Sequence, residues 1–161
     1  VSGCHHQCKG CFNECAWDFG YGNKFDEDAK EKVINYMNHD YIKGLSLLGG
    51  EPLEPSNQEG LLPLVKEVKE KFPDKTIWCY TGYDFQKDIV DGMNKTNPTT
   101  KELLKYIDVV VDGKFDENQK SPKLRFRGSA NQRILDAQET IKEDKPVEIP
   151  SLYEKDRPTF K

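Results

Sequence analysis

Hydrophobic residues at helical spacing predict two main helices in this chain. The first follows the acidic residues 26–28, and the second spans about 59–71, where Pro73 ends it. Two shorter helical stretches are expected near 85–91 and 99–106, with a loop over 94–100 between them. The apolar stripes of the main helices are Ala29, Val33, Tyr36 and Met37 in the first, and Leu61, Leu64, Val65 and Val68 in the second.

Three short apolar runs between these helices predict buried strands, at 44–48, 75–80 and 107–111. Alternating strands and helices are typical of βαβ units and a parallel sheet. Each strand ends in a polar turn that contains glycine, and ligands in α/β proteins bind at the carboxyl ends of strands. We therefore expect one ligand-binding rim. Its turns are Gly49-Gly50-Glu51, Thr81-Gly82 and Asp112-Gly113.

The chain of 161 residues has the length of one domain, and we treat 1–161 as a single unit. A strand is expected before Cys4, outside the sequence given. Ile134 and Leu135 indicate a short edge strand, and the charged tail from about 142 is expected to be extended and irregular.

Composition narrows the functional classes. Lys and Arg total 24 against 28 Asp and Glu, a net charge of −4, which argues against a general nucleic-acid binder. No apolar run approaches the roughly 20 residues of a membrane span. No secretory signal is visible, so we expect a cytoplasmic protein in a reducing compartment, where clustered thiols usually hold metal.

Four of the five cysteines lie within twelve residues. Cys4, Cys8 and Cys11 have the spacing Cys-x3-Cys-x2-Cys, and Cys15 follows four residues after Cys11. Three thiolates suit an iron–sulfur cluster with one open iron, whereas four suit a closed zinc site or a cluster that only carries electrons. The spacing alone leaves these alternatives open, so a zinc-stabilised binding module and an electron carrier both remain.

The cysteine triad, followed by a helix and a strand that ends in Gly49-Gly50-Glu51-Pro52, resembles the radical S-adenosylmethionine superfamily. The resemblance implies an α/β fold, a partial (β/α) barrel of parallel strands with the cluster and ligand at the C-terminal rim. It also implies one 4Fe–4S cluster on Cys4, Cys8 and Cys11, with S-adenosylmethionine on the fourth iron. The residues expected around this cofactor are Gly10, Cys11, Phe12, Gly49, Gly50 and Glu51, and Glu51 would anchor the ammonium group.

Further motifs resemble the anaerobic ribonucleoside-triphosphate reductase activating proteins. They are Gly10-Cys11-Phe12-Asn13, Thr81-Gly82-Tyr83, 108–114 and 127–133. This resemblance implies an oxidoreductase that cleaves S-adenosylmethionine and takes a hydrogen atom from a glycine of the reductase. The expected partners are the reductase and a flavodoxin-like or other low-potential electron donor. The alternative is another small radical S-adenosylmethionine enzyme, acting on a metabolite or a different glycyl-radical protein.

Several residues have weaker indications. Phe12 suits packing on adenine or a place in the core, and Cys15 lies outside the ligand set of the family. We expect His5 and His6 to be exposed loop residues, and Thr81 and Asp112 to form turns rather than bind ligand. A run with six basic and two acidic residues could dock an acidic partner. The basic residues are Lys114, Lys120, Lys123, Arg125, Arg127 and Arg133.

Overall fold

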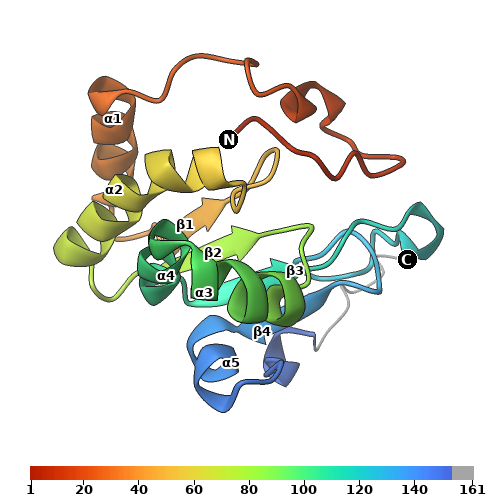
Figure 1. Cartoon of the computed structure of the whole chain (residues 1–161). Helices are drawn as coiled ribbons and strands as arrows, with labels where there is room; N and C mark the ends of the chain where they lie inside the picture. Colours follow the sequence, from red (N-terminus) through yellow and green to blue (C-terminus); the bar gives the residue numbers. More distant parts are fainter. Residues whose placement is uncertain (154–161) are drawn as a thin grey trace, which may run out of the picture.

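In a computed structural model that describes residues 1–153, four strands form one open sheet in chain order (Figure 1). The parallel strands are β1 (Gly44–Leu47), β2 (Thr76–Tyr80) and β3 (Val109–Asp112), and the edge strand is β4 (Arg133–Asp136). The predicted α/β class is confirmed. The expectation of parallel strands alone is wrong, because β4 pairs antiparallel with β3. A loop without a crossover helix joins these two strands, and such a connection returns the chain in the opposite direction.

The four predicted helical stretches are present with shifted ends, and a further helix over residues 137–143 was not predicted. The principal helices are α1 (Glu27–Met37), α2 (Pro55–Lys71), α4 (Pro98–Leu103) and α5 (Ala137–Glu143). A π-helix over Phe85–Met93 leads into the short α3 (Asn94–Thr96). The predicted loop over 94–100 is therefore wrong. Pro98 begins α4, where its missing N–H costs no helical hydrogen bond, and the Asn97 side chain caps the helix through the Thr99 N–H.

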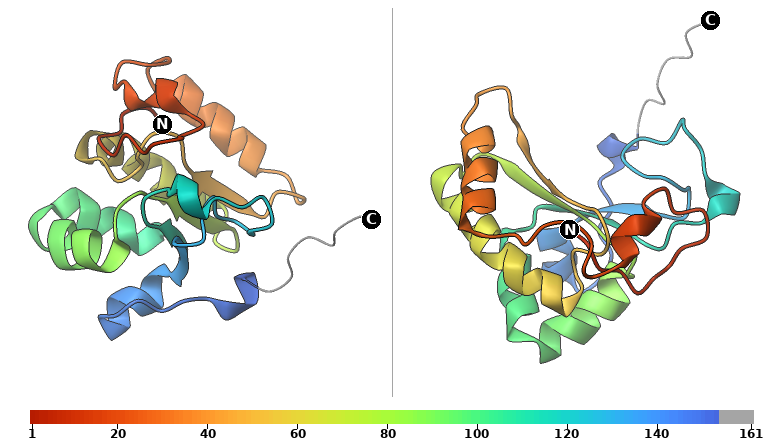
Figure 2. Two further views of the ribbon diagram at one scale, coloured as in Figure 1. Left: turned by 90° about the vertical axis from the view of Figure 1, so that its right-hand side faces the viewer. Right: turned by 90° about the horizontal axis from the view of Figure 1, so that it is seen from above.

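The sheet separates two hydrophobic clusters of unequal size. The helices α1 and α2 lie on one side of the sheet (Figure 2). The larger cluster packs α1, α2, α4 and the π-helix against one face, with Val65, Ile77 and Phe85 fully buried. The smaller cluster lies on the other face around Val111 and Ile134, and the segment 149–153 packs against it. Packing on both faces stabilises the sheet, while the carboxyl ends of its strands remain available to form a binding site.

The N-terminal segment continues the parallel order of the sheet beyond β1. The Val1 amino group donates to the Leu48 carbonyl at 2.8 Å, and the Val1 carbonyl accepts from the Gly50 N–H at 2.8 Å. A residue that bonds to both neighbours of its partner in this way is in parallel register with that partner, here Gly49. The segment therefore delivers the cysteine loop to the carboxyl end of β1, the rim that the sequence predicted.

Beyond α5, the described part of the tail returns to the sheet. Glu148 forms an isolated antiparallel bridge with Leu135, and a short 3-10 helix follows at Pro150–Leu152. The remainder of the tail that we expected to be extended, residues 154–161, lies outside the described residues. Within residues 1–153, none of the helices combines the length and apolar character needed to cross a bilayer.

Candidate functional site

The three cysteines of the predicted triad line one cavity of about 650 Å³ at the rim. Cys4 is buried, and Cys8 and Cys11 are partly exposed. Cys15 is exposed and does not contribute to the lining. Glu51 and the two glycines before it line the same cavity, which has the size of a small-molecule site. Aromatic side chains from the cysteine loop, from β2 and from the loop 113–132 form much of the remaining wall: Phe12, Trp17, Tyr80, Phe115 and Phe126.

Backbone N–H groups lie close to two of the three sulfur atoms. The Asn13 N–H lies 3.4 Å from the Cys11 Sγ. Burial raises the pKa of the Cys4 thiol, while hydrogen bonds from the backbone of His6 and Gln7 act in the opposite direction. Such donors stabilise a thiolate once a metal replaces the proton. Cys15 differs, because its thiol donates to the Asn13 Oδ1 at 3.3 Å.

Within residues 1–153, no three Cys, His, Asp or Glu side chains gather around a point that one metal ion would fill. A zinc site requires such convergence. An iron–sulfur cubane does not, since each thiolate binds a different iron. The three thiols line one cavity, where each is available to a different iron of a cubane.

The Gly-Gly turn makes room for the cysteine loop itself. Gly49 has a φ of 121°, and a Cβ atom there would collide with the Val1 backbone. A Cβ on Gly50 would lie 2.6 Å from the Gly3 carbonyl oxygen and 2.7 Å from that of Ala16. We expected these glycines to lie beside the cofactor. Both line the cavity, but the backbone that approaches them most closely belongs to the protein.

We therefore expect Gly50→Ala to displace the cysteine loop, because both obstructing atoms are backbone oxygens that cannot rotate away. Overpacking of this kind costs about 1–3 kcal/mol. The reconstituted variant should hold less iron per chain while its far-ultraviolet circular dichroism stays unchanged. Gly60→Ala in α2 is the matched control, since nothing lies within 4 Å of its added Cβ. Equal iron content in the two variants would contradict this role of Gly50.

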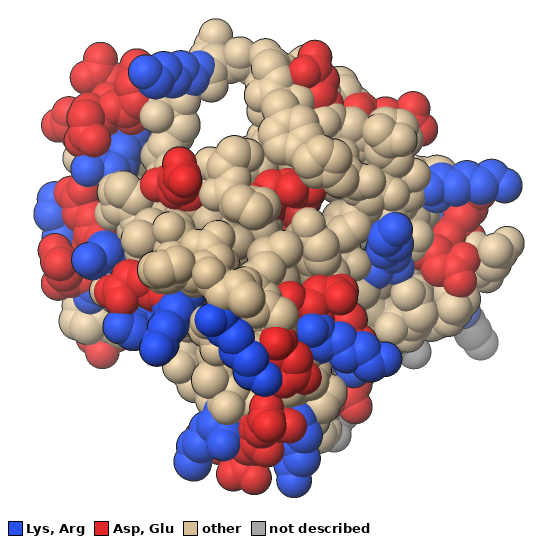
Figure 3. All heavy atoms as spheres, viewed as in Figure 1, with Lys and Arg blue, Asp and Glu red and all other residues tan. Residues whose placement is uncertain are grey.

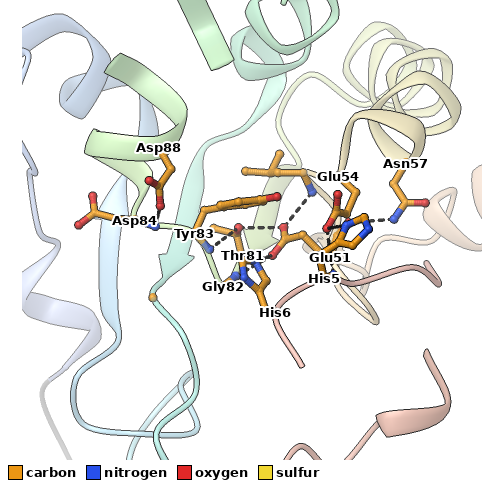
Figure 4. Close-up of polar contacts among 12 residues, drawn as sticks. His5, His6, Glu51, Glu54, Asn57, Thr81, Gly82, Tyr83, Asp84 and Asp88 are labelled. Carbon is orange, nitrogen blue, oxygen red and sulfur yellow. Dashed lines mark hydrogen bonds and ion pairs between the residues drawn. The ribbon is translucent and has the colours of Figure 1, made fainter. Parts of the chain in front are cut away.

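Glu51 is the centre of a buried hydrogen-bond network (Figure 4). Its side chain is only 1% exposed, and its carboxylate accepts four hydrogen bonds. Oε1 accepts from the Leu53 N–H at 2.9 Å and from the Thr81 hydroxyl at 2.8 Å. Oε2 accepts from the Gly82 N–H at 2.7 Å and from His6 Nε2 at 2.9 Å. This carboxylate thus joins the cysteine loop, the Gly-Gly-Glu turn and the end of β2.

The two histidines between the cysteines differ sharply. The His5 side chain is 75% exposed and hydrogen-bonds to Glu54, in agreement with the prediction of an exposed residue. The prediction is wrong for His6, whose side chain is 9% exposed. Its partner Glu51 lies 45 positions away in the sequence. No local pattern indicates a contact at that separation, so sequence reasoning had no means of finding it.

Phe12 and Gly10 form the outer part of the cysteine loop. Phe12 is 99% exposed, so the alternative of a core aromatic is wrong. The ring lines the cavity mouth, where it is available to a ligand. Gly10 has a φ of 74°, and an added Cβ would lie 3.0 Å from the Glu117 carboxyl group. Gly10 therefore serves the turn of the loop and its contact with the segment 113–132.

The two other rim candidates hold the scaffold together. Thr81 binds Glu51 through its hydroxyl and also accepts from the Tyr83 N–H at 3.1 Å. Asp112 is buried, accepts from the Phe85 N–H at 2.8 Å and forms an ion pair with Arg133. The Asp112 carboxylate raises the pKa of the Arg133 guanidinium further above its already high value. Both residues therefore have structural contacts, and Thr81 also lines the cavity.

The basic run divides into structural and exposed residues. Arg133 pairs with Asp112, and Arg127 donates to the carbonyls of Ala130 and Gln132 and stacks on the Tyr153 ring. Lys114, Lys120 and Lys123 are exposed. On the face shown in Figure 3, charged side chains gather over α1, α2 and α5, and a largely uncharged band crosses the upper middle.

A match to a known protein family spans all the residues that line this cavity. Residues 1–135 match the sequence model of a family described as a 4Fe-4S single cluster domain. The chain is 47% identical over 136 residues to the anaerobic ribonucleoside-triphosphate reductase-activating protein of Haemophilus influenzae, a match that covers 83% of each chain. The protein of the same name from Vibrio cholerae is 44% identical over 83% of each chain. That of Enterobacteria phage T4 is 42% identical over 134 residues, which are 83% of this chain and 79% of the relative. No solved structure matches the chain.

Proposed function

Because this chain belongs to the family of anaerobic ribonucleoside-triphosphate reductase-activating proteins, we propose that it generates the glycyl radical of an anaerobic ribonucleotide reductase. The observation that carries the proposal is the cavity on which the cysteine triad and Glu51 meet, within the residues that the family match spans. When bound there, a reduced 4Fe–4S cluster supplies the electron that cleaves S-adenosylmethionine. The remaining roles belong to the chain's own residues.

We propose Cys4, Cys8 and Cys11 as the cluster ligands. Their sulfurs face one cavity, and two of them are placed near backbone N–H donors. Cys15 is left out of the ligand set because its thiol is exposed and hydrogen-bonded to the Asn13 side chain. One iron then has no protein thiolate and is open to the substrate.

The binding residues that we propose for S-adenosylmethionine lie on the same cavity. Glu51 anchors the ammonium group through a charge-assisted hydrogen bond. Phe12 packs on the adenine, for which its exposed ring is suited. Gly49 and Gly50 shape the turn, and Gly10 with Cys11 forms the outer edge of the site. The aromatic walls exclude water from the reacting groups.

We also propose that the sheet is part of a partial (β/α) barrel. The parallel register of Val1 with Gly49 supports this, since it adds one more parallel segment to the free edge of β1. The cytoplasm, where thiols stay reduced, is the compartment that we propose, and the electron source is a flavodoxin-like or other low-potential donor.

The direct test of function combines the reconstituted protein with an anaerobic ribonucleotide reductase, S-adenosylmethionine and a chemical reductant. We expect methionine to be released and the doublet of a glycyl radical to appear in the electron paramagnetic resonance spectrum of the reductase. Release of methionine without any glycyl signal would favour a different substrate, and therefore the alternative of another radical S-adenosylmethionine enzyme.

Docking of the reductase should depend on the basic residues Lys123 and Arg125, in the loop beside the cavity that we call the basic loop. We expect Lys123→Glu combined with Arg125→Glu to lower the yield of glycyl radical severalfold at low salt, with methionine release unchanged. High salt should reduce the yield of the wild-type protein similarly, by screening. Arg127 is excluded from the test because it supports the loop.

The matched control reverses Lys142 and Lys145, which are exposed on and after α5. This variant has the same change in net charge at a different surface. An equal loss of radical yield in the two double variants would contradict docking at the basic loop. A parallel loss of methionine release would show that the loop supports the active site instead.

A further inference from the structure

His6 stands between two cavities. It lines the cavity that holds the three cysteines, and it also lines a second one of about 540 Å³. Gly82 is the other residue shared by both. The second cavity is bounded chiefly by the π-helix and the end of β3, through Tyr83, Lys87, Asp88, Gly92, Met93 and Lys114. The imidazole ring is therefore part of the partition between them.

The backbone around His6 is adapted to hold the ring. A Cβ on Gly82 would lie 2.5 Å from the His6 Cδ2, so a side chain at that position would exclude the imidazole. Tyr83 contacts the ring edge-on, with centroids 4.5 Å apart and an interplanar angle of 72°. The His6 ring thus has a defined position, and the lack of a side chain at Gly82 makes room for it.

The hydrogen bonds of Glu51 leave no room for a further donor. A carboxylate has about four acceptor positions, and all four are filled in this structure. Leu53 and Gly82 donate from the backbone, and Thr81 donates from a short side chain at the strand end. His6 donates from a longer side chain on the cysteine loop, and its Nε2 must carry the proton because a carboxylate only accepts.

An ammonium group that binds Glu51 must therefore replace one of these donors. Displacement of a backbone N–H would require the turn or the strand end to move. Displacement of His6 requires only rotation of one side chain toward the open second cavity.

We propose that His6 occupies Glu51 Oε2 only in the absence of substrate. The α-ammonium group of S-adenosylmethionine then displaces His6 from this oxygen. The proposal rests on the proposed function, in which Glu51 binds that ammonium. Substrate binding thus breaks the hydrogen bond through which His6 links the cysteine loop to Glu51 and the end of β2. His6 acts through Glu51, so it is a positioning residue rather than a catalytic one.

The test is calorimetric titration of S-adenosylmethionine into the cluster-loaded, oxidised protein, with iron content measured for each variant. His6→Ala removes the competing donor and should bind about tenfold more tightly, since a hydrogen bond to a charged group no longer has to be broken. His6→Gln keeps an amide donor of similar reach and should bind like the wild type. His5→Ala is the matched control, because its exposed ring contacts Glu54 and not Glu51.

Weaker or unchanged binding by His6→Ala with a normal iron content would overturn the proposal. Equal tightening by His6→Gln would also overturn it, since the hydrogen bond would then be irrelevant. If His6→Ala loses its cluster, a crystal structure of the wild-type complex decides the question. We expect the distance from His6 Nε2 to Glu51 Oε2 to exceed hydrogen-bond length, and an intact contact would overturn displacement. Failure of the proposed function is distinguishable, because the wild-type protein would then bind no S-adenosylmethionine.

Discussion

Replacement of Cys4, Cys8 or Cys11 by alanine should each prevent assembly of a normal 4Fe–4S cluster. The three sulfurs line one cavity and each would bind a separate iron, so the loss of one leaves two irons without protein thiolates. We expect iron and sulfide per chain to fall to a small fraction of the wild-type amount after anaerobic reconstitution. The visible absorbance of the cluster should fall in proportion.

Cys15→Ala is the control for this set and should keep the full cluster. Cys15 lies only four residues after Cys11, but its thiol is exposed and bonded to Asn13. Loss of iron from Cys15→Ala equal to that from Cys11→Ala would make the site four-thiolate. The open iron, and with it the binding of S-adenosylmethionine to the cluster, would then have to be abandoned.

Glu51 should produce the second large effect, on both stability and binding. Glu51→Ala leaves four hydrogen-bond donors without an acceptor. Two of them, the Leu53 N–H and the Thr81 hydroxyl, are buried. Each unsatisfied buried group costs about 1–3 kcal/mol, so we expect the free energy of unfolding to fall by at least about 2 kcal/mol. Thermal denaturation followed by circular dichroism measures this loss.

Glu51→Gln perturbs the fold less than Glu51→Ala, because the amide keeps the shape of the side chain and one acceptor oxygen. Loss of the charged hydrogen bond to the substrate ammonium is worth about 1.5–3 kcal/mol, or roughly tenfold to over a hundredfold in affinity. Calorimetry on the cluster-loaded variant measures it. Glu54→Gln is the matched control, since Glu54 is also buried but contacts His5. Unchanged affinity in Glu51→Gln would remove Glu51 from the substrate site.

The sequence predicted the scaffold well because its signals are local. Helical stripes, strand-length apolar runs and three glycine turns indicated α1, α2, three parallel strands and a common rim. The direction of β4 was missed, since nothing in Ile134 and Leu135 specifies how an edge strand pairs. Asn94–Thr100 was mistaken for a loop because Pro98 interrupts the pattern, although proline at a helix start is favourable.

The sequence indicated which motifs meet at the cavity but not how their side chains are connected. The triad and Gly49-Gly50-Glu51 carry recognisable spacing, and the structure places them on one cavity. The role of Gly50 in seating the cysteine loop depends on the Gly3 and Ala16 carbonyls, which come from a distant segment. His6 and its bond to Glu51 depend on the same long-range approach. Such contacts follow from tertiary packing and leave no periodic signal in the sequence.

The most direct measurement of the central claim is electron paramagnetic resonance of the anaerobically reconstituted and reduced protein, with and without S-adenosylmethionine. Three thiolate ligands leave one iron open, so substrate should bind the cluster itself and alter its signal. We predict a clear change in the g values and line shape when S-adenosylmethionine is added. A cluster whose spectrum is identical with and without S-adenosylmethionine, in protein that retains its full iron content, would contradict the account.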